Sequence, residues 1–257
     1  TGVQTCALPI SPAHIRESAI DSIRGGKTAY TSNSGLYELR HAIAAHILTH
    51  TGVAYDPEEE ILVTVGVSEA LQQAMLALIN PGDEVIIPEP CFVAYTACVI
   101  FAGGTPVMVP THMADDFAVN PAAIAAAITP RTKAILIGYP NNPTGAVIDG
   151  VAMQAIVDIA LQHDLVLLSD EIYDRLVYGV PHISAVSMAG ARECTVLMGG
   201  FSKAYAMTGW RLGWITAPAG LIADIGKIIE YNTSCAQMFV QRAGVAAVTQ
   251  EIGRAHV

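Results

Sequence analysis

The stretch ILVTVGVSEALQQAMLALINPGDEVIIP (61–88) indicates how this chain folds. Residues 61–66 form an apolar run typical of a buried strand, and residues 68–79 carry apolar side chains at helical spacing. The turn residues NPGD (80–83) then end the helix before a second apolar run at 84–88. The stretch therefore predicts a strand, a helix and a second strand in direct succession.

The same alternation continues on both sides of this stretch. Helices are predicted at 36–47, 92–104, 121–128 and 151–164, and further strands at 106–110, 133–140, 165–171 and 194–201. Each strand is a near-continuous apolar run, which is typical of parallel strands covered by helices on both faces. The sequence predicts one α/β domain of three layers, α/β/α, with a mainly parallel mixed sheet.

Composition excludes several classes of protein. The 257 residues are enough for a large core, and no apolar run reaches the ~18–20 residues of a membrane helix. The net charge of −10 argues against a nucleic-acid surface, which needs clustered Lys and Arg. The first residues lack the basic and apolar regions of a signal peptide. We therefore expect a cytoplasmic protein that binds neither nucleic acid nor membrane.

Cysteines and histidines do not form a metal-binding pattern. The five cysteines lack metal-ligand spacing and are too sparse for a disulfide framework, so they are expected to be reduced thiols. The eight histidines are scattered, and we interpret them as surface or capping residues. No metal site is expected.

The two ends of the chain differ from the rest. VQTCALPI (3–10) and EIGRAHV (251–257) fit neither a helix nor a strand pattern. With suitable codons, the DNA for one is nearly the reverse complement of the DNA for the other. We interpret residues 1–11 and 251–257 as translated sequencing adapter, and frayed natural termini are the alternative. Residues 12–250 are then the folded domain, and the natural gene is expected to continue in both directions.

Polar residues interrupt the apolar pattern where several strands end. Ligands of such sheets bind beyond the carboxyl ends of the strands. Each of these residues also has a structural explanation, as a helix cap, a turn residue or a core tyrosine. The residues that follow the first, fourth, fifth and sixth strands are Gly66, Ser68, Asn141, Asn142, Asp170, Tyr173 and Lys203. So many at one edge of a sheet favour a binding site.

The stretch GGFSKAYAMTGWRLGW (199–214) poses a related question, because it is mostly apolar yet carries two cations. They are Lys203 and Arg211, in a chain with only 14% charged residues. Burying a lone cation is costly unless it is paired, neutralised or bonded to a ligand. The sequence around them therefore raises the question of what the two cations bind.

Three motifs together carry a family resemblance. YPNNPTG (139–145), SDEIYDRLVY (169–178) and FSKAYAMTGWRLGW (201–214) resemble, in order and spacing, the class I and II aminotransferases. These are pyridoxal-phosphate enzymes with the fold type I architecture of aspartate aminotransferase. The resemblance covers most of residues 12–250 and implies the cofactor-binding large domain, with the small domain largely missing.

The resemblance implies roles around the cofactor's aldehyde and ring. Lys203 matches the lysine that holds pyridoxal phosphate as a Schiff base. Asp170 matches the carboxylate that keeps the pyridine nitrogen protonated, and Asn142 and Tyr173 match the hydrogen-bond donors to the ring oxygen. Phe92 falls where the family stacks an aromatic ring on the cofactor. Lys203, Asp170 and Tyr173 are the expected catalytic residues.

Other matches concern the cofactor's phosphate. Arg211 matches the family arginine, whose planar fork suits two phosphate oxygens. The backbone amides entering the helix at 68–79 and one additional hydroxyl are the other candidates, and they belong to Gly66, Val67, Ser68 and Ser202. Tyr30 resembles the tyrosine that crosses a dimer interface to the neighbour's phosphate, but a tyrosine before a surface turn is an equally good interpretation. The resemblance thus implies a homodimer.

Two departures from the family limit these expectations. Gly200 stands where many relatives carry a phosphate-binding serine, and the chain ends before the small domain that holds the arginine for the substrate carboxylate. The resemblance implies transfer of an amino group from an amino acid to a 2-oxo acid, with this chain inactive alone. A pyridoxal-phosphate β-lyase and the aminotransferase-like effector domain of a transcription regulator remain alternatives.

Overall fold

The computed structural model describes residues 10–250 of the chain. The two terminal segments interpreted as adapter sequence therefore lie almost wholly outside the described residues. Ser11 is an exception, because it is buried and its hydroxyl donates to the Ala206 carbonyl at 2.7 Å and accepts from the Trp210 indole at 2.9 Å. Ser11 thus packs against the fold, although we had assigned it to the first of these segments.

Seven strands form a single mixed sheet in the order β1-β7-β6-β5-β4-β2-β3. All neighbouring pairs are parallel except those of β7, which runs antiparallel to both β1 and β6. The predicted mainly parallel mixed sheet is confirmed. The strands are β1 (Ile61–Thr64), β2 (Glu84–Glu89), β3 (Thr105–Pro110), β4 (Thr132–Gly138), β5 (Val166–Asp170), β6 (Thr195–Gly200) and β7 (Gly213–Thr216).

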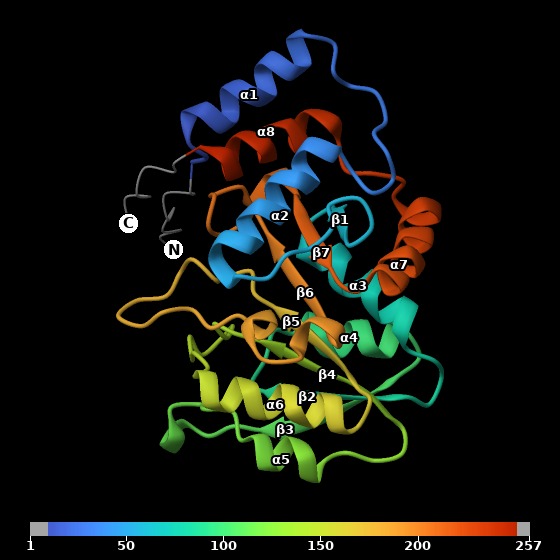
Figure 1. Ribbon diagram of the computed structural model, residues 1–257, viewed down its shortest axis with the longest axis vertical. Helices are drawn as coiled ribbons and strands as arrows, with labels where there is room; N and C mark the ends of the chain where they lie inside the picture. The colour runs from blue at the N-terminus through green and yellow to red at the C-terminus, as the bar shows by residue number, and fades with distance from the viewer. Residues whose placement is uncertain (1–9, 251–257) are drawn as a thin grey trace, which may run out of the picture.

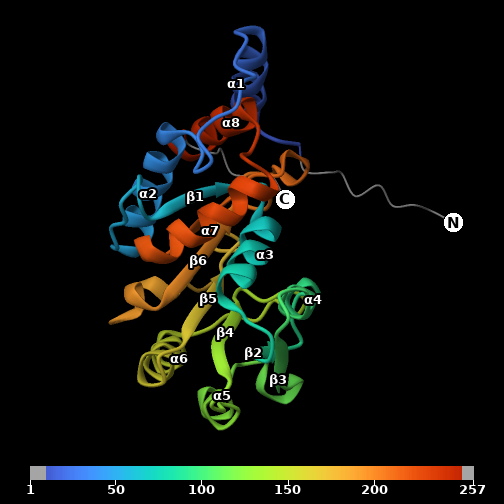
Figure 2. The ribbon, with the colours of Figure 1, turned by 90° about the vertical axis from the view of Figure 1, so that its right-hand side faces the viewer.

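Helices cover both faces of this sheet, so the predicted three layers are also confirmed (Figures 1 and 2). On one face lie α3, α4 and α7; on the other lie α5 and α6 near β4 and β2, and α1, α2 and α8 near β1 and β7. The helices are α1 (Ala13–Arg24), α2 (Tyr37–Thr51), α3 (Val67–Leu78), α4 (Ala94–Phe101), α5 (Pro121–Ala126), α6 (Gly150–Gln162), α7 (Ala219–Asn232) and α8 (Met238–Thr249).

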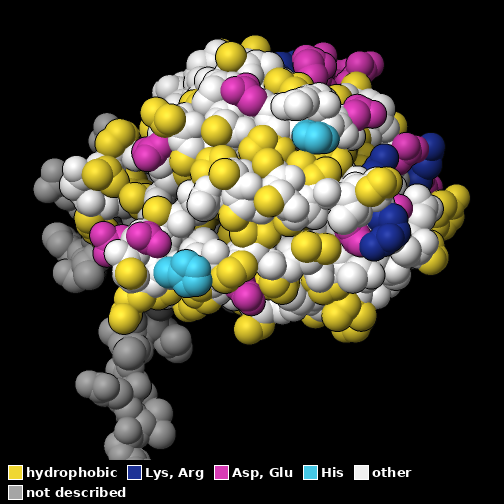
Figure 3. Space-filling view, turned by 90° about the horizontal axis from the view of Figure 1, so that it is seen from below, with side chains coloured by type: hydrophobic (Ala, Val, Ile, Leu, Met, Phe, Trp, Pro, Cys, Tyr) yellow, Lys and Arg dark blue, Asp and Glu magenta, His cyan; other side chains and the backbone are white. Residues whose placement is uncertain are grey.

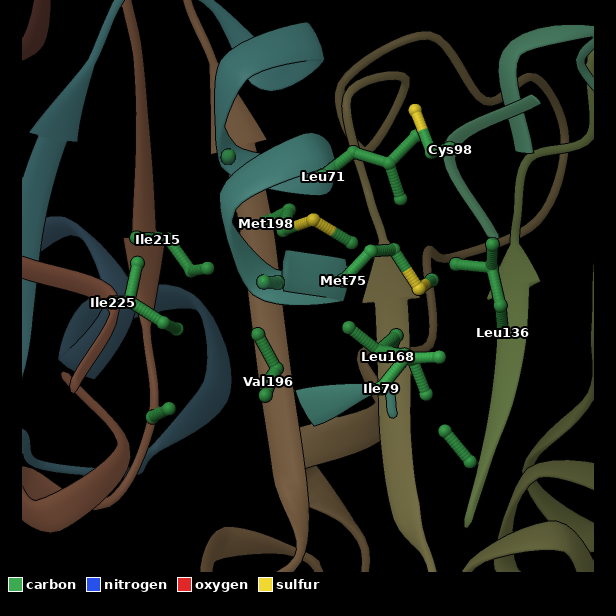
Figure 4. Close-up of a cluster of buried hydrophobic side chains, with 14 of the residues drawn as sticks. Leu71, Met75, Ile79, Cys98, Leu136, Leu168, Val196, Met198, Ile215 and Ile225 are labelled. Atoms are coloured by element: carbon green, nitrogen blue, oxygen red, sulfur yellow. The ribbon is translucent and has the colours of Figure 1, made fainter. Parts of the chain in front are cut away.

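Strand register explains why the sheet has two separate apolar faces. Leu168 on β5 pairs with Val196 on β6, and both belong to the cluster under α3, α4 and α7. Figure 4 shows this cluster, in which Leu71 and Met75 of α3 lie over the strand side chains. Successive strand residues point to opposite faces. Side chains at 167 and 197 therefore face the opposite layer of helices.

Two parts of the sequence prediction need correction. The helix expected at 92–104 is shorter, because α4 begins at Ala94 and Gly103 has a left-handed φ of +89° soon after its end. The elements α1, β7, α7 and α8 were not predicted. β7 has only four residues and begins inside the motif that carries Lys203 and Arg211, so the sequence offers no separate apolar run that would predict it.

The outer edge of the sheet at β3 is protected by proline. Within residues 10–250, β3 pairs only with β2, and its sequence TPVMVP includes Pro106 and Pro110, which have no N–H to offer another strand. Figure 3 views the molecule from this end, where hydrophobic side chains cover much of the middle and charged ones lie mainly toward the rim. The two prolines of β3 therefore discourage edge-to-edge pairing with another strand.

Candidate active site

Strand direction brings the predicted polar residues together. β1, β4, β5 and β6 run parallel, so their carboxyl ends meet at one edge of the sheet, beside the start of β7. A pocket of about 200 Å³ opens there. Nine residues predicted for the site line it: Val67, Ser68, Phe92, Asn142, Asp170, Tyr173, Ser202, Lys203 and Arg211.

Asp170 lies at the end of β5 with its carboxylate buried on the α4 side of the sheet. Its Oδ2 accepts a hydrogen bond from the Tyr95 hydroxyl at 2.9 Å, and its Oδ1 accepts one from the Ile172 amide at 3.1 Å. Gly138 makes room for this contact, because a Cβ there would lie 2.1 Å from the Tyr95 oxygen. Both donors are neutral, so the described residues give this carboxylate hydrogen bonds but no ion pair.

Burial changes the titration of this pair. Loss of water raises the pKa of Asp170 to about 6, although the bonds from Tyr95 and the Ile172 amide oppose the rise. Burial, followed by the charge of Asp170, also raises the pKa of the Tyr95 hydroxyl well above its ordinary value. The Tyr95 hydroxyl therefore stays protonated and donates its hydrogen bond. The Asp170 carboxylate can form an ion pair with a cationic group of a ligand.

Asp170→Asn should change the pH dependence of the chain's stability. A raised carboxyl pKa stabilises the fold below the unfolded value and loses that contribution as pH rises through about 6. Between pH 7 and pH 5 the wild type should therefore gain about 1 kcal/mol in free energy of unfolding relative to the variant. Urea unfolding at the two pH values measures this difference. An equal change in both proteins would show that Asp170 is already ionised at pH 5.

Lys203 and Tyr173 lie next to each other on the wall of the pocket. The Lys203 Nζ lies 5.3 Å from the centre of the Tyr173 ring, within the range of a cation–π contact. Lys203 and Arg211 are both exposed, so neither is a lone buried cation. Each lies on the wall of the pocket, where it remains accessible to a ligand from solvent.

Arg211 and the start of α3 lie against each other on the pocket wall. Gly66 precedes α3 with a φ of +80°, and a Cβ there would lie 2.6 Å from Nη2 of Arg211. The glycine therefore lets the guanidinium lie against the backbone at the positive end of the helix dipole. Gly213 is equally constrained, because a Cβ there would lie 2.7 Å from the Val67 nitrogen. Cation and amides are thus gathered as an anion site needs.

The two asparagines of the YPNNPTG motif have different roles, and Gly200 lies where apolar side chains leave little room. Asn142 lines the pocket, whereas the Asn141 side chain accepts from the amide and hydroxyl of Thr144 and shapes the turn. At Gly200 a Cβ would lie 3.0 Å from Cδ1 of Ile172 and 3.1 Å from Cγ2 of Val67. Two apolar side chains therefore crowd the position of the family serine.

Some predicted residues lie elsewhere, and some pocket residues were missed. Tyr30 is 86% exposed and does not line the pocket, so it is not part of this site in a single copy of the chain. Tyr95 was missed, because the aromatic residue expected for the site was Phe92, which precedes α4, and not the tyrosine in its first turn. Pocket residues with no clear sequence signal are Leu71, Pro140, Ile172 and Thr208.

The interpretation of all histidines as surface or capping residues is wrong for His182. Its side chain is only 17% exposed and contacts the buried carboxylate of Glu171. Within residues 10–250, no cluster of three His, Cys, Asp or Glu side chains is arranged to bind a metal. No helix in the same range is long and apolar enough to cross a membrane.

Comparison with known proteins decides the family. The family model for aminotransferases of class I and II matches residues 7–256. The chain belongs to this family. The putative aminotransferase YugH of Bacillus subtilis is 46% identical to this chain. The aligned region covers 90% of this chain and 60% of YugH. Aromatic-amino-acid aminotransferase 2 of Thermococcus litoralis is 40% identical, over 94% of the chain and 62% of the relative.

Solved structures agree with this assignment. The crystal structure of an aromatic aminotransferase from Pyrococcus horikoshii aligns with the aminotransferase chain at a TM-score of 0.92 and 41% identity. The alignment covers 94% of this chain and 65% of that structure. The predicted family and fold are confirmed. The aminotransferase chain spans about 60% of the length of its curated relatives.

Proposed function

We propose that this chain is the pyridoxal-phosphate-binding large domain of an aminotransferase, and that the whole protein transfers an amino group from an amino acid to a 2-oxo acid. One observation carries the proposal. An amine, a buried carboxylate and a guanidinium beside a helix start line a single pocket, and they belong to Lys203, Asp170 and Arg211. Those are the groups that pyridoxal phosphate needs at its aldehyde, ring nitrogen and phosphate.

The residues present fit this cofactor. The Asp170 carboxylate is buried without a cation, and its residue, 6% exposed, still lines the pocket. Because Gly66 has no Cβ, the Arg211 guanidinium can lie in the space that a side chain at this position would occupy. When bound, pyridoxal phosphate supplies an aldehyde that reacts with amines and a ring that accepts electrons. A carboxylate for the ring nitrogen and an arginine for the phosphate are thus available in one pocket.

The chain's own groups would then act as follows. Lys203 Nζ is the amine within the pocket and the base available for the substrate's α-proton. Asp170 would hold a proton on a ring nitrogen placed against it. Asn142 and the Tyr173 hydroxyl would orient the ring, and Phe92 would lie against its face. The edge-to-face contact of Phe92 with Tyr95, at 5.8 Å between ring centres, supports a fixed orientation for that aromatic ring.

The names of the relatives favour transamination over the two alternatives. The Thermococcus litoralis relative and the Pyrococcus horikoshii structure are both named aminotransferases. Neither a lyase nor a regulator is supported by a specific feature of the pocket. The substrate side chain is left open, since relatives with similar identity are named for aromatic amino acids and for aspartate.

A homodimer forms part of this proposal. Tyr30 is 86% exposed and outside the pocket of its own copy, so it would contact a phosphate only in a second copy. The segment that follows it is held firmly, because the buried Gln241 amide accepts from the Leu36 N–H at 2.7 Å and donates to the Thr31 hydroxyl at 3.0 Å. Sedimentation equilibrium of the full-length protein tests the dimer. A monomer that binds the cofactor normally would contradict a role for Tyr30 across an interface.

Gly66→Ala should weaken pyridoxal-phosphate binding by about tenfold, because the new Cβ displaces the Arg211 guanidinium. Gly82→Ala is the matched control: Gly82 also has a positive φ, +95°, but a Cβ there meets nothing within 4 Å. Both substitutions should cost about 1 kcal/mol of stability through backbone strain. Dissociation constants from cofactor titration distinguish them. Equal affinities in the two variants would argue against Arg211 and the start of α3 as the phosphate site.

A further inference from the structure

The Glu171 carboxylate lies directly behind the candidate active site, on the opposite face of the sheet from Asp170. Adjacent residues at the end of β5 point to opposite faces, so Asp170 faces α4 and Glu171 faces the α6 side. Glu171 is 6% exposed. A buried carboxylate of this kind needs donors on both oxygens.

Three groups contact this carboxylate, one from β5 and two from the far end of the segment that follows it. Oε1 accepts from the Ser169 hydroxyl at 3.0 Å and from the Ala185 amide at 2.9 Å. Oε2 contacts Nε2 of His182 at 2.8 Å. The segment 172–184 leaves the sheet at Glu171 and returns to the same side chain at its other end. Glu171 and His182 therefore close this segment into a loop.

The start of this loop belongs to the candidate active site. The Ile172 amide donates to Asp170, Tyr173 lies against Lys203, and both residues line the pocket. Farther along, Tyr178 is 78% exposed and Val180 is 48% exposed, so the middle of the loop has little packing of its own. Apart from the contact of Arg175 with His50 on α2, the position of the loop therefore depends on its two attached ends.

Several charged groups surround His182. Burial by itself lowers the pKa of His182, but the Glu171 hydrogen bond and the charges of Glu171 and Asp174 outweigh it and raise the pKa. Burial also raises the pKa of Asp174 to about 6. Arg175 follows Asp174 in sequence, and its Nη1 lies 2.5 Å from Nε2 of His50 on α2. The net effect of these groups favours the protonated imidazole beside Glu171.

We propose that His182 is a positioning residue for the cofactor site: by binding Glu171 it fixes the loop 172–184 and so holds Ile172 and Tyr173 in the pocket. This inference rests on the proposed function. His182 touches neither the pocket nor Lys203, so its effect would pass through the loop. The contact should be strongest with a protonated imidazole and should weaken as pH rises through the raised pKa of His182.

Two substitutions and one control test the inference on the whole 257-residue chain. His182→Leu leaves Oε2 of Glu171 without its donor, whereas His182→Gln keeps a neutral amide donor but cannot titrate. His163→Leu, at an exposed histidine after α6, is the control. The measurements are the pyridoxal-phosphate dissociation constant at pH 6, 7 and 9, the melting temperature, and hydrogen exchange of the Ala185 amide in the absence of cofactor.

The expected pattern is specific. At pH 6, the dissociation constant of pyridoxal phosphate should be about tenfold higher for His182→Leu than for wild type. At pH 9 this ratio of dissociation constants should be only about threefold. His182→Gln should remain within about threefold of wild type, and His163→Leu should be unchanged. Comparing variant with wild type at each pH removes the titration of the cofactor itself. Ala185 should exchange faster only in His182→Leu.

Other outcomes would overturn the inference in distinguishable ways. If His182→Leu lowers the melting temperature but keeps wild-type affinity at every pH, His182 only stabilises the fold. If the affinity ratio does not depend on pH, the protonated imidazole is not the group that fixes the loop. Failure of the wild-type chain to bind pyridoxal phosphate would overturn the proposed function and this inference with it.

Discussion

Borohydride treatment of the cofactor-loaded chain should leave a pyridoxyl group on Lys203, and Lys203→Ala should retain none. The chain has four lysines, namely Lys27, Lys133, Lys203 and Lys227, and only Lys203 lines the pocket. An amine on the pocket wall, next to the Tyr173 ring, is the one that a bound aldehyde would meet. Peptide mass mapping of the reduced protein identifies the modified lysine.

The activity of a full-length protein should follow the same pattern. Lys203→Ala should lower the rate of amino-group transfer by about 10⁴ or more, because it removes both the attacking amine and the α-proton base. Lys227→Ala is the control, since Lys227 lies on α7 and pairs with Asp224 at 2.9 Å. A modified Lys27, Lys133 or Lys227 in the wild type, with Lys203 unmodified, would refute the assignment.

Much of the fold was predictable because its strands are buried on both faces. Such strands are apolar throughout, so β1, β2, β4, β5 and β6 stand out in the sequence without reference to any partner. Each is also followed by a turn or a helix start, which predicted the edge where polar residues gather. The nine pocket residues were predicted from this rule and from the family motifs together.

The remaining features depend on contacts that no local pattern encodes. The Tyr95 contact with Asp170 needs the space that Gly138 leaves by having no side chain. Gly138 lies on a different strand, so the spacing of residues along the chain does not reveal that the three residues meet. The burial of His182 depends on Glu171, which is 11 positions away in sequence. Nor does a motif reveal exposure: Lys203 and Arg211 lie among apolar residues in sequence, but their side chains point outward into an open pocket.

Asp170→Ala should slow the half-reaction of a full-length protein with its amino acid by about 10²–10⁴, while weakening pyridoxal-phosphate binding much less. The reason lies in the buried carboxylate. Its partners, Tyr95 and the Ile172 amide, are neutral, and burial raises its pKa to about 6. A protonated ring nitrogen would supply the missing positive charge. The stabilisation is greatest when the ring withdraws electrons from the substrate, which is the step measured by single-turnover absorbance changes.

Tyr95→Phe separates the charge of Asp170 from its hydrogen bonding. This variant removes the donor to Oδ2, which lies 2.9 Å from the tyrosine oxygen, but leaves the carboxylate and its Ile172 bond. If the negative charge is what matters, Tyr95→Phe should slow the half-reaction by less than about tenfold, far from the loss in Asp170→Ala. Because the hydroxyl lowers the Asp170 pKa, its removal should also move the acid limb of the rate profile toward higher pH. Equal losses in both variants would mean that the tyrosine hydroxyl, rather than the carboxylate charge, carries the effect.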